Sequence, residues 1–364
     1  MKRAVIDGIG VVGGFGCGLD ELKQALQAGK SPRQSVRLLT GKGEVTVPAL
    51  LADTAPLENY VAKKALRRLD HYTRLAVLGG FLALDDAGML ENRSGRMGII
   101  LATGYGATCN TADFAHSLAG GSDIFGSPTR FSNSVHNAAA AHLAILLGEK
   151  GPNLSLSQFD MSVAQAFLMA LVWLSEERVD TVLVGGVDEY CNVLGHYWHT
   201  LYGDRAGFRQ ERSVPAHAVI GEGAAFFVLS SPAKAPIRQG VIESVRLGRA
   251  VRPLPVGHNR SPVILGADGY SDCLNRYPRF MPAVADIGVY TGIYGALPVG
   301  QAFDLAVAAL SLAGGKMYPP VSPGEKFMAT LGLSRRATGL KTGRVHCVKL
   351  GSADDYGMVT VATY

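Results

Sequence analysis

The segment from Gly151 to Tyr190, GPNLSLSQFDMSVAQAFLMALVWLSEERVDTVLVGGVDEY, decides the fold of this chain. It predicts a short strand, a turn, a long helix and a second strand. The helix is apolar on nearly all sides through Leu174, so we expect it to be buried rather than half exposed. Nucleophiles often lie at such a strand-to-helix turn. This turn contains Gln158, Phe159 and Asp160, and no cysteine.

Strands and apolar helices alternate on both sides of this segment. Helical patterns cover 73–90, 136–148 and 301–315, and strand patterns cover 95–106, 218–232 and the C-terminal region. The stretch 232–240 is typical of a connector. The pattern predicts a layered α/β architecture made of two related halves, residues 1–235 and 236–364, within one compact unit.

Composition narrows the range of functions. The 364 residues are 48% hydrophobic and 18% charged, which excludes disorder for the bulk of the chain. The formal charge is +5, and the densest basic stretch, Lys63 to Arg74, lacks a nucleic-acid-binding motif. We interpret this stretch as a solvated helix face, with a docking patch for an acidic partner as the alternative. Isolated cysteines, no signal peptide and no apolar run of about 18 residues predict a cytoplasmic protein without membrane contact.

Three glycines near the N-terminus, Gly8, Gly10 and Gly13, match the pattern G-x-G-x-x-G. A dinucleotide site also needs a helix that opens inside this motif and an acidic residue about 20 positions later. Neither is present in the sequence, so we interpret these residues as turn glycines and expect no cofactor. No cluster of histidine, cysteine and carboxylate residues has metal-ligand spacing, so no metal site is expected.

Several segments together resemble the β-ketoacyl synthase, or condensing enzyme, family. They occur in the family's order: VIDGIGVVGGFGCGLDELKQALQAGKS, LALDDAGML, FSNSVHNAAAAHLAILLGEKGPNLSLS, VDTVLVGGVDEY and VIGEGAAFFVL. The resemblance covers nearly the whole chain. It implies a thiolase-like five-layer αβαβα sandwich built from two related halves, and a dimer.

The resemblance also implies three catalytic positions, a cysteine and two histidines. Counting from the shared Gly-Pro places the nucleophile at Asp160, with Ser162 retained two residues later; Gln158 would require a shift of two residues. The first histidine position falls on Asp268. The second falls on Ile293 or Tyr294, depending on where a one-residue gap is placed. The family's closing Gly-Phe-Gly-Gly loop is replaced by KLGSADDYG. We therefore expect no catalytic residue in this chain.

Asp160 has a simple structural interpretation at the start of the predicted helix. Aspartate is a favoured N-cap residue, and the helix dipole favours its charge, so we expect a cap that stabilises the helix by about 1 kcal/mol relative to alanine. The same negative charge opposes decarboxylation of a malonyl group, because it repels both the substrate and the enolate that forms.

The replacements favour a non-catalytic subunit of the chain-length-factor type. Such a subunit pairs with an active β-ketoacyl synthase and an acyl carrier protein in fatty acid, polyene or polyketide assembly, more readily as a heterodimer than as a homodimer. The resemblance places Asn133, His136, Asn137 and Phe159 at the interface and acyl tunnel. Two alternatives remain: an acyltransferase or hydrolase that uses Asp160 and Asp268 with a shared proton, and a homodimeric module that binds an acyl carrier protein.

Overall fold

A computed structural model describes most of the chain. The described residues are 3–40, 43–91, 95–119, 127–202, 218–232, 239–250, 254, 261–268, 273–281, 286–321, 328–329, 331, 333, 336–352 and 354–363. The predicted boundary between residues 235 and 236 lies outside these ranges and stays a prediction, as does most of the predicted connector.

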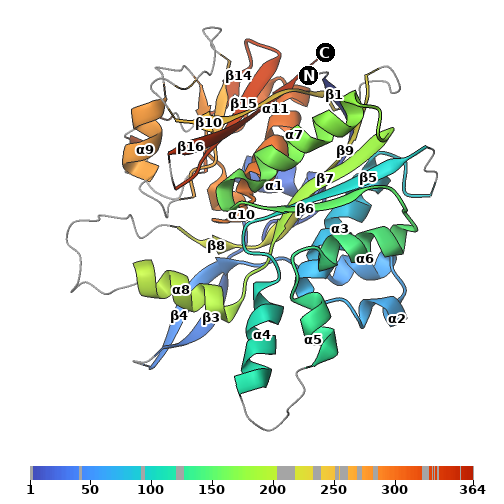
Figure 1. The fold of residues 1–364 in the computed structure, drawn as a ribbon. Coiled ribbons are helices and arrows are strands. Elements are labelled where there is room, and N and C mark those ends of the chain that lie inside the picture. The colour runs from blue at the N-terminus through green and yellow to red at the C-terminus, as the bar shows by residue number, and fades with distance from the viewer. Residues whose placement is uncertain are drawn as a thin grey trace.

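An eleven-stranded sheet organises the molecule (Figure 1). Its strand order is β12-β11-β15-β16-β10-β1-β9-β7-β5-β6, and β2 pairs with β1. Only Ala4–Ile242 and Val5–Val241 join β1 to β10, so the sheet divides there into two parts. The strands of this sheet are β1 (Ala4–Gly13), β2 (Gly16–Cys17), β5 (Met97–Thr103), β6 (Asn153–Ser157), β7 (Thr181–Asp188), β9 (Gly223–Ser230), β10 (Val241–Arg249), β11 (Val263–Leu265), β12 (Ile287–Gly288), β15 (Arg344–Leu350) and β16 (Asp355–Ala362).

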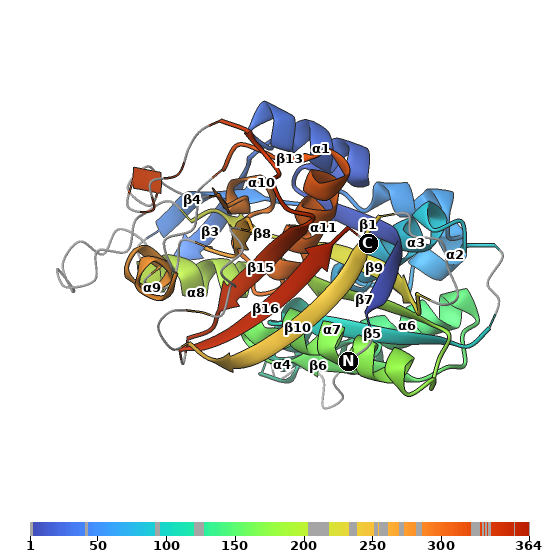
Figure 2. The same ribbon diagram turned by 90° about the horizontal axis from the view of Figure 1, so that it is seen from above.

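Helices form three layers around the two parts of the sheet (Figure 2). The helices α7 and α11 lie between the two parts and contact strands of both, α3 and α6 cover the outer face of the first part, and α9 packs on the second. This is the five-layer αβαβα arrangement that the resemblance implied. The helices are α1 (Leu19–Ala28), α2 (Lys63–Leu66), α3 (His71–Asp86), α4 (Thr108–Ala119), α5 (Pro128–Asn133), α6 (Ala138–Leu147), α7 (Ser162–Ser175), α8 (Asn192–Tyr202), α9 (Cys273–Phe280), α10 (Thr291–Tyr294) and α11 (Gly300–Ala313), with short 3-10 turns η1 (Ala55–Asn59) and η2 (Phe159–Met161).

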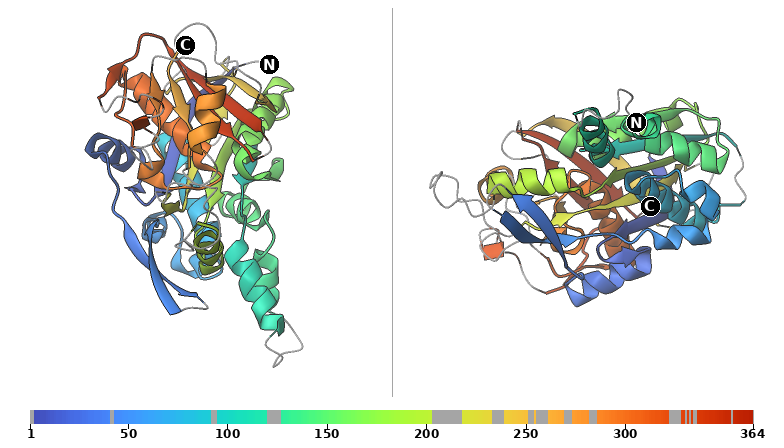
Figure 3. Two further views of the ribbon diagram at one scale, coloured as in Figure 1. Left: turned by 90° about the vertical axis from the view of Figure 1, so that its left-hand side faces the viewer. Right: turned by 90° about the horizontal axis from the view of Figure 1, so that it is seen from below.

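Some strands lie outside the helix and strand patterns that the sequence predicted. A hairpin of β3 (Gln34–Thr40) and β4 (Gly43–Leu50) pairs with β8 (Ile220–Gly221), and β13 (Lys316–Met317) pairs with β14 (Thr338–Gly339). Helix α8 follows β7. The hairpin, α4, α5 and α8 lie at the end of the molecule opposite the two termini (Figures 1 and 3).

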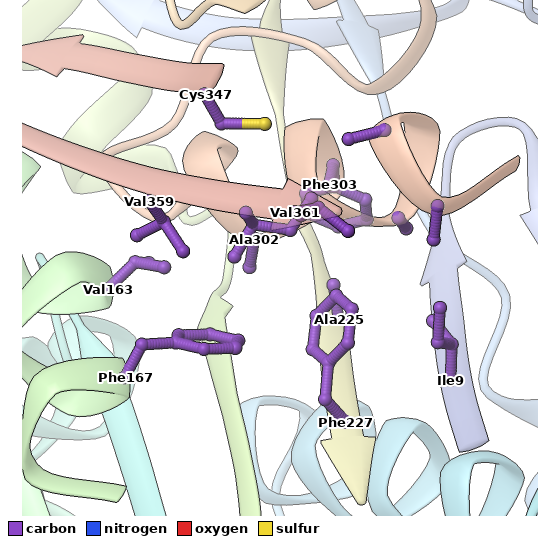
Figure 4. Packing of buried hydrophobic residues seen from close by; sticks show 14 of the residues in the cluster. Ile9, Val163, Phe167, Ala225, Phe227, Ala302, Phe303, Cys347, Val359 and Val361 are labelled. Carbon is purple, nitrogen blue, oxygen red and sulfur yellow. The ribbon is translucent and has the colours of Figure 1, made fainter. Parts of the chain in front are cut away.

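The central helix α7 is buried as predicted. Figure 4 shows Phe167 of α7 and Phe227 of β9 in the cluster between the layers, with ring centroids 5.3 Å apart in an edge-on arrangement. Ala302 and Phe303 of α11 belong to the same cluster. Burial of each phenylalanine contributes about 2 kcal/mol, so this layer holds the two parts of the sheet together.

Gly8 and Gly10 lie within β1, so their interpretation as turn glycines was wrong, whereas Gly13 ends β1 and pairs with Gly16 across the turn to β2. A Cβ added at Gly8 would lie 2.4 Å from the Ala83 carbonyl oxygen, and one at Gly10 would lie 2.2 Å from the Gly79 carbonyl oxygen. Because both contacts are with the backbone of α3, these glycines allow the strand and the helix to approach closely.

Candidate functional site

The nucleophile position lies in the short turn between β6 and α7. Phe159, just before it, has a φ of 44°, the left-handed region that costs a side-chain-bearing residue of order 1–3 kcal/mol. Ser162 is fully buried, and its hydroxyl accepts a hydrogen bond from the Gln158 backbone N–H at 2.7 Å. The Gln158 side chain is paired with Gln165.

Asp160 does not cap α7, so that prediction was wrong. The N-cap residue is Met161, and within the described residues no side-chain hydrogen bond caps the helix. The Asp160 carboxylate is directed instead to β15, where its Oδ1 lies 3.2 Å from Lys349 Nζ. An ammonium ion is a stronger partner for this carboxylate than the backbone N–H groups of the helix.

Lys349 joins two of the predicted catalytic positions. Its Nζ also lies 3.5 Å from Oδ2 of Asp268, the first histidine position. The lysine is buried, with 1% of its surface exposed, whereas the carboxylates of Asp160 and Asp268 keep 23% and 16% of their side-chain surface exposed. We call Asp160, Lys349 and Asp268 the ion triad. It connects η2 of the first part of the molecule to β15 and the loop after β11 of the second part.

The sequence analysis missed Lys349. A signal was present, because the charged residue stands in the otherwise apolar end of the strand RVHCVKL. Burial raises the pKa of Asp160, the nearby Lys349 ammonium lowers it, and the Asp268 charge raises it again, with a net upward shift. The Lys349 ammonium thus holds the Asp160 carboxylate inside a poorly solvated site.

The second histidine position is occupied by an apolar side chain if it falls on Ile293 and by a phenol if it falls on Tyr294. Ile293 and Tyr294 are both fully buried in α10. The Tyr294 hydroxyl donates a hydrogen bond to Asp304 Oδ1 at 2.5 Å. The second oxygen of Asp304, Oδ2, has no hydrogen-bond partner among the residues that the structure describes. The phenol therefore serves the packing of α10 against α11.

A second buried carboxylate shapes the loop after β5. Asp188, at the end of β7, accepts hydrogen bonds from Thr103 Oγ1 at 2.7 Å and from the backbone N–H groups of Gly104 and Tyr105 at 3.0 and 2.9 Å. Burial raises its pKa to about 6 despite these donors. Asp188 thereby fixes the loop that carries Tyr105, whose phenol lies within electrostatic reach of the ion triad.

The four predicted interface residues do not share one environment. Asn133, at the end of α5, is buried and donates from Nδ2 to the Arg68 carbonyl oxygen at 3.5 Å. His136 is exposed and packs over Gly106, and Asn137 is exposed at the start of α6. Phe159 exposes 64% of its surface. Three of the four residues therefore lie on the surface of this chain.

Asp304→Asn should change the pH dependence of stability. Burial raises the pKa of Asp304 to about 7, above its ordinary value of 3.8. A carboxyl group whose pKa is raised in the folded state stabilises the protein at low pH, and this contribution is lost as the pH rises from about 4 to 7. We expect wild type to lose about 4 kcal/mol relative to the variant over this window.

Urea unfolding at pH 4 and pH 8 measures the difference between Asp304→Asn and wild type. Asp20→Asn, on the exposed start of α1, is the matched control and should follow wild type at both values. Equal pH slopes for wild type and Asp304→Asn would contradict the assignment.

Comparisons with known proteins identify the family. Residues 1–235 match the family model described as Beta-ketoacyl synthase, N-terminal domain, so the chain belongs to the β-ketoacyl synthase family. Its fold is the thiolase-like sandwich that the resemblance implied. Among curated proteins, it is 28% identical over 270 residues to the chloroplastic 3-oxoacyl-[acyl-carrier-protein] synthase I of Hordeum vulgare, covering 69% of this chain and 57% of that relative. The matched region thus spans little more than half of that relative.

Solved structures agree on the fold. A β-ketoacyl synthase from Burkholderia phymatum STM815 matches with a TM-score of 0.78 and 20% identity, covering all of both chains. The ishigamide ketosynthase/chain length factor matches with a TM-score of 0.78 and 17% identity, covering all of this chain and 99% of the other.

None of the helices in the described ranges is both long and apolar enough to cross a membrane. The described residues also contain no group of three or more potential ligands that could hold a metal ion.

Proposed function

We propose that this chain is a non-catalytic ketosynthase-like subunit of the chain-length-factor type. It pairs in the cytoplasm with an active β-ketoacyl synthase in fatty acid, polyene or polyketide assembly on an acyl carrier protein. One observation carries the proposal: Asp160, at the nucleophile position, is ion-paired with the buried Lys349. A condensing enzyme needs a thiolate to hold the acyl chain.

The ion triad also argues against an acyltransferase or hydrolase that uses two acidic residues. That chemistry needs one carboxylate to act as a base while its neighbour holds a shared proton. Here the Lys349 ammonium contacts both carboxylates, so a cation takes the place of the shared proton. The ammonium lowers the pKa of Asp160 against the larger effect of burial, and its contact with both carboxylates removes the need for a proton between them.

The edge of the sheet supports a dimer. Strand β6 ends the sheet, and no described strand pairs with its outer edge. Helix α6 packs beside this strand, where Asn153 Nδ2 donates to the Ala140 carbonyl oxygen at 2.8 Å. Exposed apolar side chains occur on α6, which contacts β6, and on η2, which follows β6 in the chain: Ile145 and Phe159. Two more, Phe131 and Val135, lie on α5 and between α5 and α6. An unpaired edge flanked by apolar side chains is typical of a surface that another chain covers.

Purification of the native complex tests the proposal. We expect a one-to-one complex with a second chain of similar size that carries a cysteine and two histidines at the three catalytic positions, identified by mass spectrometry. The isolated chain should not turn over acyl thioesters. A homodimer without such a partner, or elongation of an acyl carrier protein substrate by the chain alone, would overturn the proposal.

Phe159→Asp should weaken this pairing. The substitution places a charge on an exposed apolar residue beside the sheet edge, so we expect an increase in Kd of at least about tenfold, which corresponds to 1.4 kcal/mol. Leu39→Asp, on the exposed β3 hairpin, is the control because it makes the same change far along the chain from β6. Analytical ultracentrifugation of the purified pair measures the effect, and equal Kd values for the two variants would exclude Phe159 from the interface.

The basic surface at α2 is the proposed site for the acyl carrier protein. Lys64, Arg67 and Arg68 are all exposed, and beside them is a cavity of about 230 Å³ lined in part by Arg67, Arg74 and Leu66. An acidic carrier is attracted to such a surface, and salt weakens the attraction.

Reversing the charge at Arg67 and Arg68 should reduce carrier binding. For the double variant Arg67→Glu/Arg68→Glu we expect about tenfold weaker binding at 50 mM salt and a smaller loss at 500 mM. Surface plasmon resonance with the immobilised carrier and the intact complex gives both values. Lys341→Glu, an exposed lysine before β15, is the control. An equal loss of binding with the control would mean that only net charge matters.

A further inference from the structure

The cavity beside α2 lies where three elements meet. Residues of η1, of α2 and of the first turn of α3 line it, among them Glu58, Leu66 and Arg74. Its volume of about 230 Å³ is well above the roughly 15 Å³ that one water molecule needs and below the roughly 300–1,000 Å³ of pockets that enclose drug-sized ligands. The cavity therefore suits a ligand of a few heavy atoms.

The charge of the lining favours an anion. Lys63, Arg67 and Arg74 are cations, and Glu58 is the one carboxylate among the lining residues, which gives the lining a net charge of +2. Glu58 is already paired with Lys63, with Oε2 and Nζ 3.1 Å apart. Within the described part of the chain, neither Arg67 nor Arg74 forms an ion pair with a carboxylate. The charge of the two arginines is thus available to a ligand.

Arg74 is held in place by backbone carbonyl groups. Its Nε donates to the Leu69 carbonyl oxygen at 3.1 Å, and its Nη2 donates to the Leu66 carbonyl oxygen at 2.9 Å. These acceptors carry no net charge, so they orient the guanidinium without neutralising it. A guanidinium has five N–H donors, and the donors that remain can bind a ligand. Because the side chain is already oriented, it loses little conformational entropy when an anion binds.

We propose that this cavity is a binding site for a phosphate group, either as the inorganic ion or as part of a small phosphate monoester. The planar fork of an arginine matches two oxygens of a phosphate. Thr54 adds a hydroxyl donor to the lining. A phosphate monoester has a charge of about −1.5 to −2 at neutral pH, which balances the lining, whereas a carboxylate has a single charge and only two oxygens. This inference goes beyond the partner-subunit function.

Titration of the full chain with ethyl phosphate tests the site. Phosphorus NMR at about 50 mM salt gives the Kd, because screening of the surface charges is still weak there. Arg67→Gln and Arg68→Gln remove the same charge from adjacent exposed residues, but only Arg67 lines the cavity. We expect the Kd to rise at least about tenfold in Arg67→Gln and less than about twofold in Arg68→Gln. Arg74→Lys keeps the charge and loses the fork, so its Kd should rise at least about fivefold.

Three anions determine the class of ligand. Acetate should bind at least about tenfold more weakly than ethyl phosphate, because it has half the charge. Tighter binding of ethyl phosphate than of inorganic phosphate would assign the site to a monoester, and the reverse would assign it to the inorganic ion; both results support a phosphate site. Equal Kd values for Arg67→Gln and Arg68→Gln would overturn the site, as would acetate that binds as tightly as ethyl phosphate. The comparison of Arg67 with Arg68 decides the question even if Arg74→Lys does not fold.

The result is separate from that of the proposed carrier site, although Arg67 belongs to both. If both proposals hold, saturating ethyl phosphate should weaken carrier binding more than acetate does at the same ionic strength. A chain that binds ethyl phosphate through Arg67 but binds no acyl carrier protein would contradict the carrier site and leave the phosphate site standing. A chain that binds the carrier but not ethyl phosphate would overturn the phosphate site alone.

Discussion

Lys349→Met should lower the free energy of unfolding by about 3 kcal/mol at pH 7.5. The substitution keeps the length of the buried stem and removes a cation that contacts both Asp160 and Asp268. Both carboxylates then lose this cation in a poorly solvated site, and removal of one partner from a buried ion pair typically costs 3–5 kcal/mol. The expected value is at the lower end of that range because both carboxylates retain some exposure. Urea unfolding followed by circular dichroism measures it.

The charge on the two carboxylates, rather than the loss of packing, should cause this effect. The variant Lys349→Met/Asp160→Asn/Asp268→Asn should therefore regain most of the lost stability, because replacing a buried ion pair by neutral groups is often nearly neutral. Lowering the pH should have the same effect on Lys349→Met, since burial raises the pKa of Asp160 and its protonation removes the charge. Lys341→Met, on the exposed surface, should change stability by less than about 0.5 kcal/mol.

If the triple variant loses as much free energy of unfolding as Lys349→Met does, the lysine acts through its packing alone. In that case the ion triad would contribute nothing to the connection between η2 and β15.

The sequence predicted the layers well because they depend on hydrophobic pattern. A helix as apolar as 162–175 has no side that suits water, so the sheet must cover it from both sides. The strand at 181–188 is apolar from Val182 to Val187 for the same reason, and every one of its residues is buried. Elements that are polar on one side gave a weaker signal, and the β3–β4 hairpin, whose tip exposes Leu39, was not predicted.

The site could be predicted only in part, because spacing locates positions and does not show what fills them. Counting from Gly151 and Pro152 placed Asp160 at the turn. Asp160 and Asp268 lie close together because Lys349 contacts both carboxylates. The lysine is 189 positions from Asp160, and only the pairing of strands in three dimensions brings them together. Helix-capping propensity, which is a local preference, was overridden by this distant cation.

Gly10→Ala is the second change with a large expected effect, a loss of about 3 kcal/mol in the free energy of unfolding. The new Cβ would lie 2.2 Å from the Gly79 carbonyl oxygen and 2.3 Å from the Ala83 backbone nitrogen of α3. Neither atom belongs to a flexible side chain, so β1 and α3 must separate, and overpacking of this kind typically costs 1–3 kcal/mol or more. Because β1 also pairs with β9 and β10, the displacement spreads into the sheet.

Gly339→Ala provides the comparison for this prediction. A Cβ at Gly339 has nothing within 4 Å, and this residue lies in the short strand β14 away from α3. Its substitution should change the free energy of unfolding by less than about 0.5 kcal/mol. Equal losses at Gly10 and Gly339 would mean that the cost does not come from the contact with α3; the lower flexibility of the unfolded chain cannot cause it, because that effect stabilises the folded protein. A loss confined to Gly10 would confirm that the N-terminal glycine pattern serves the packing of a strand on a helix.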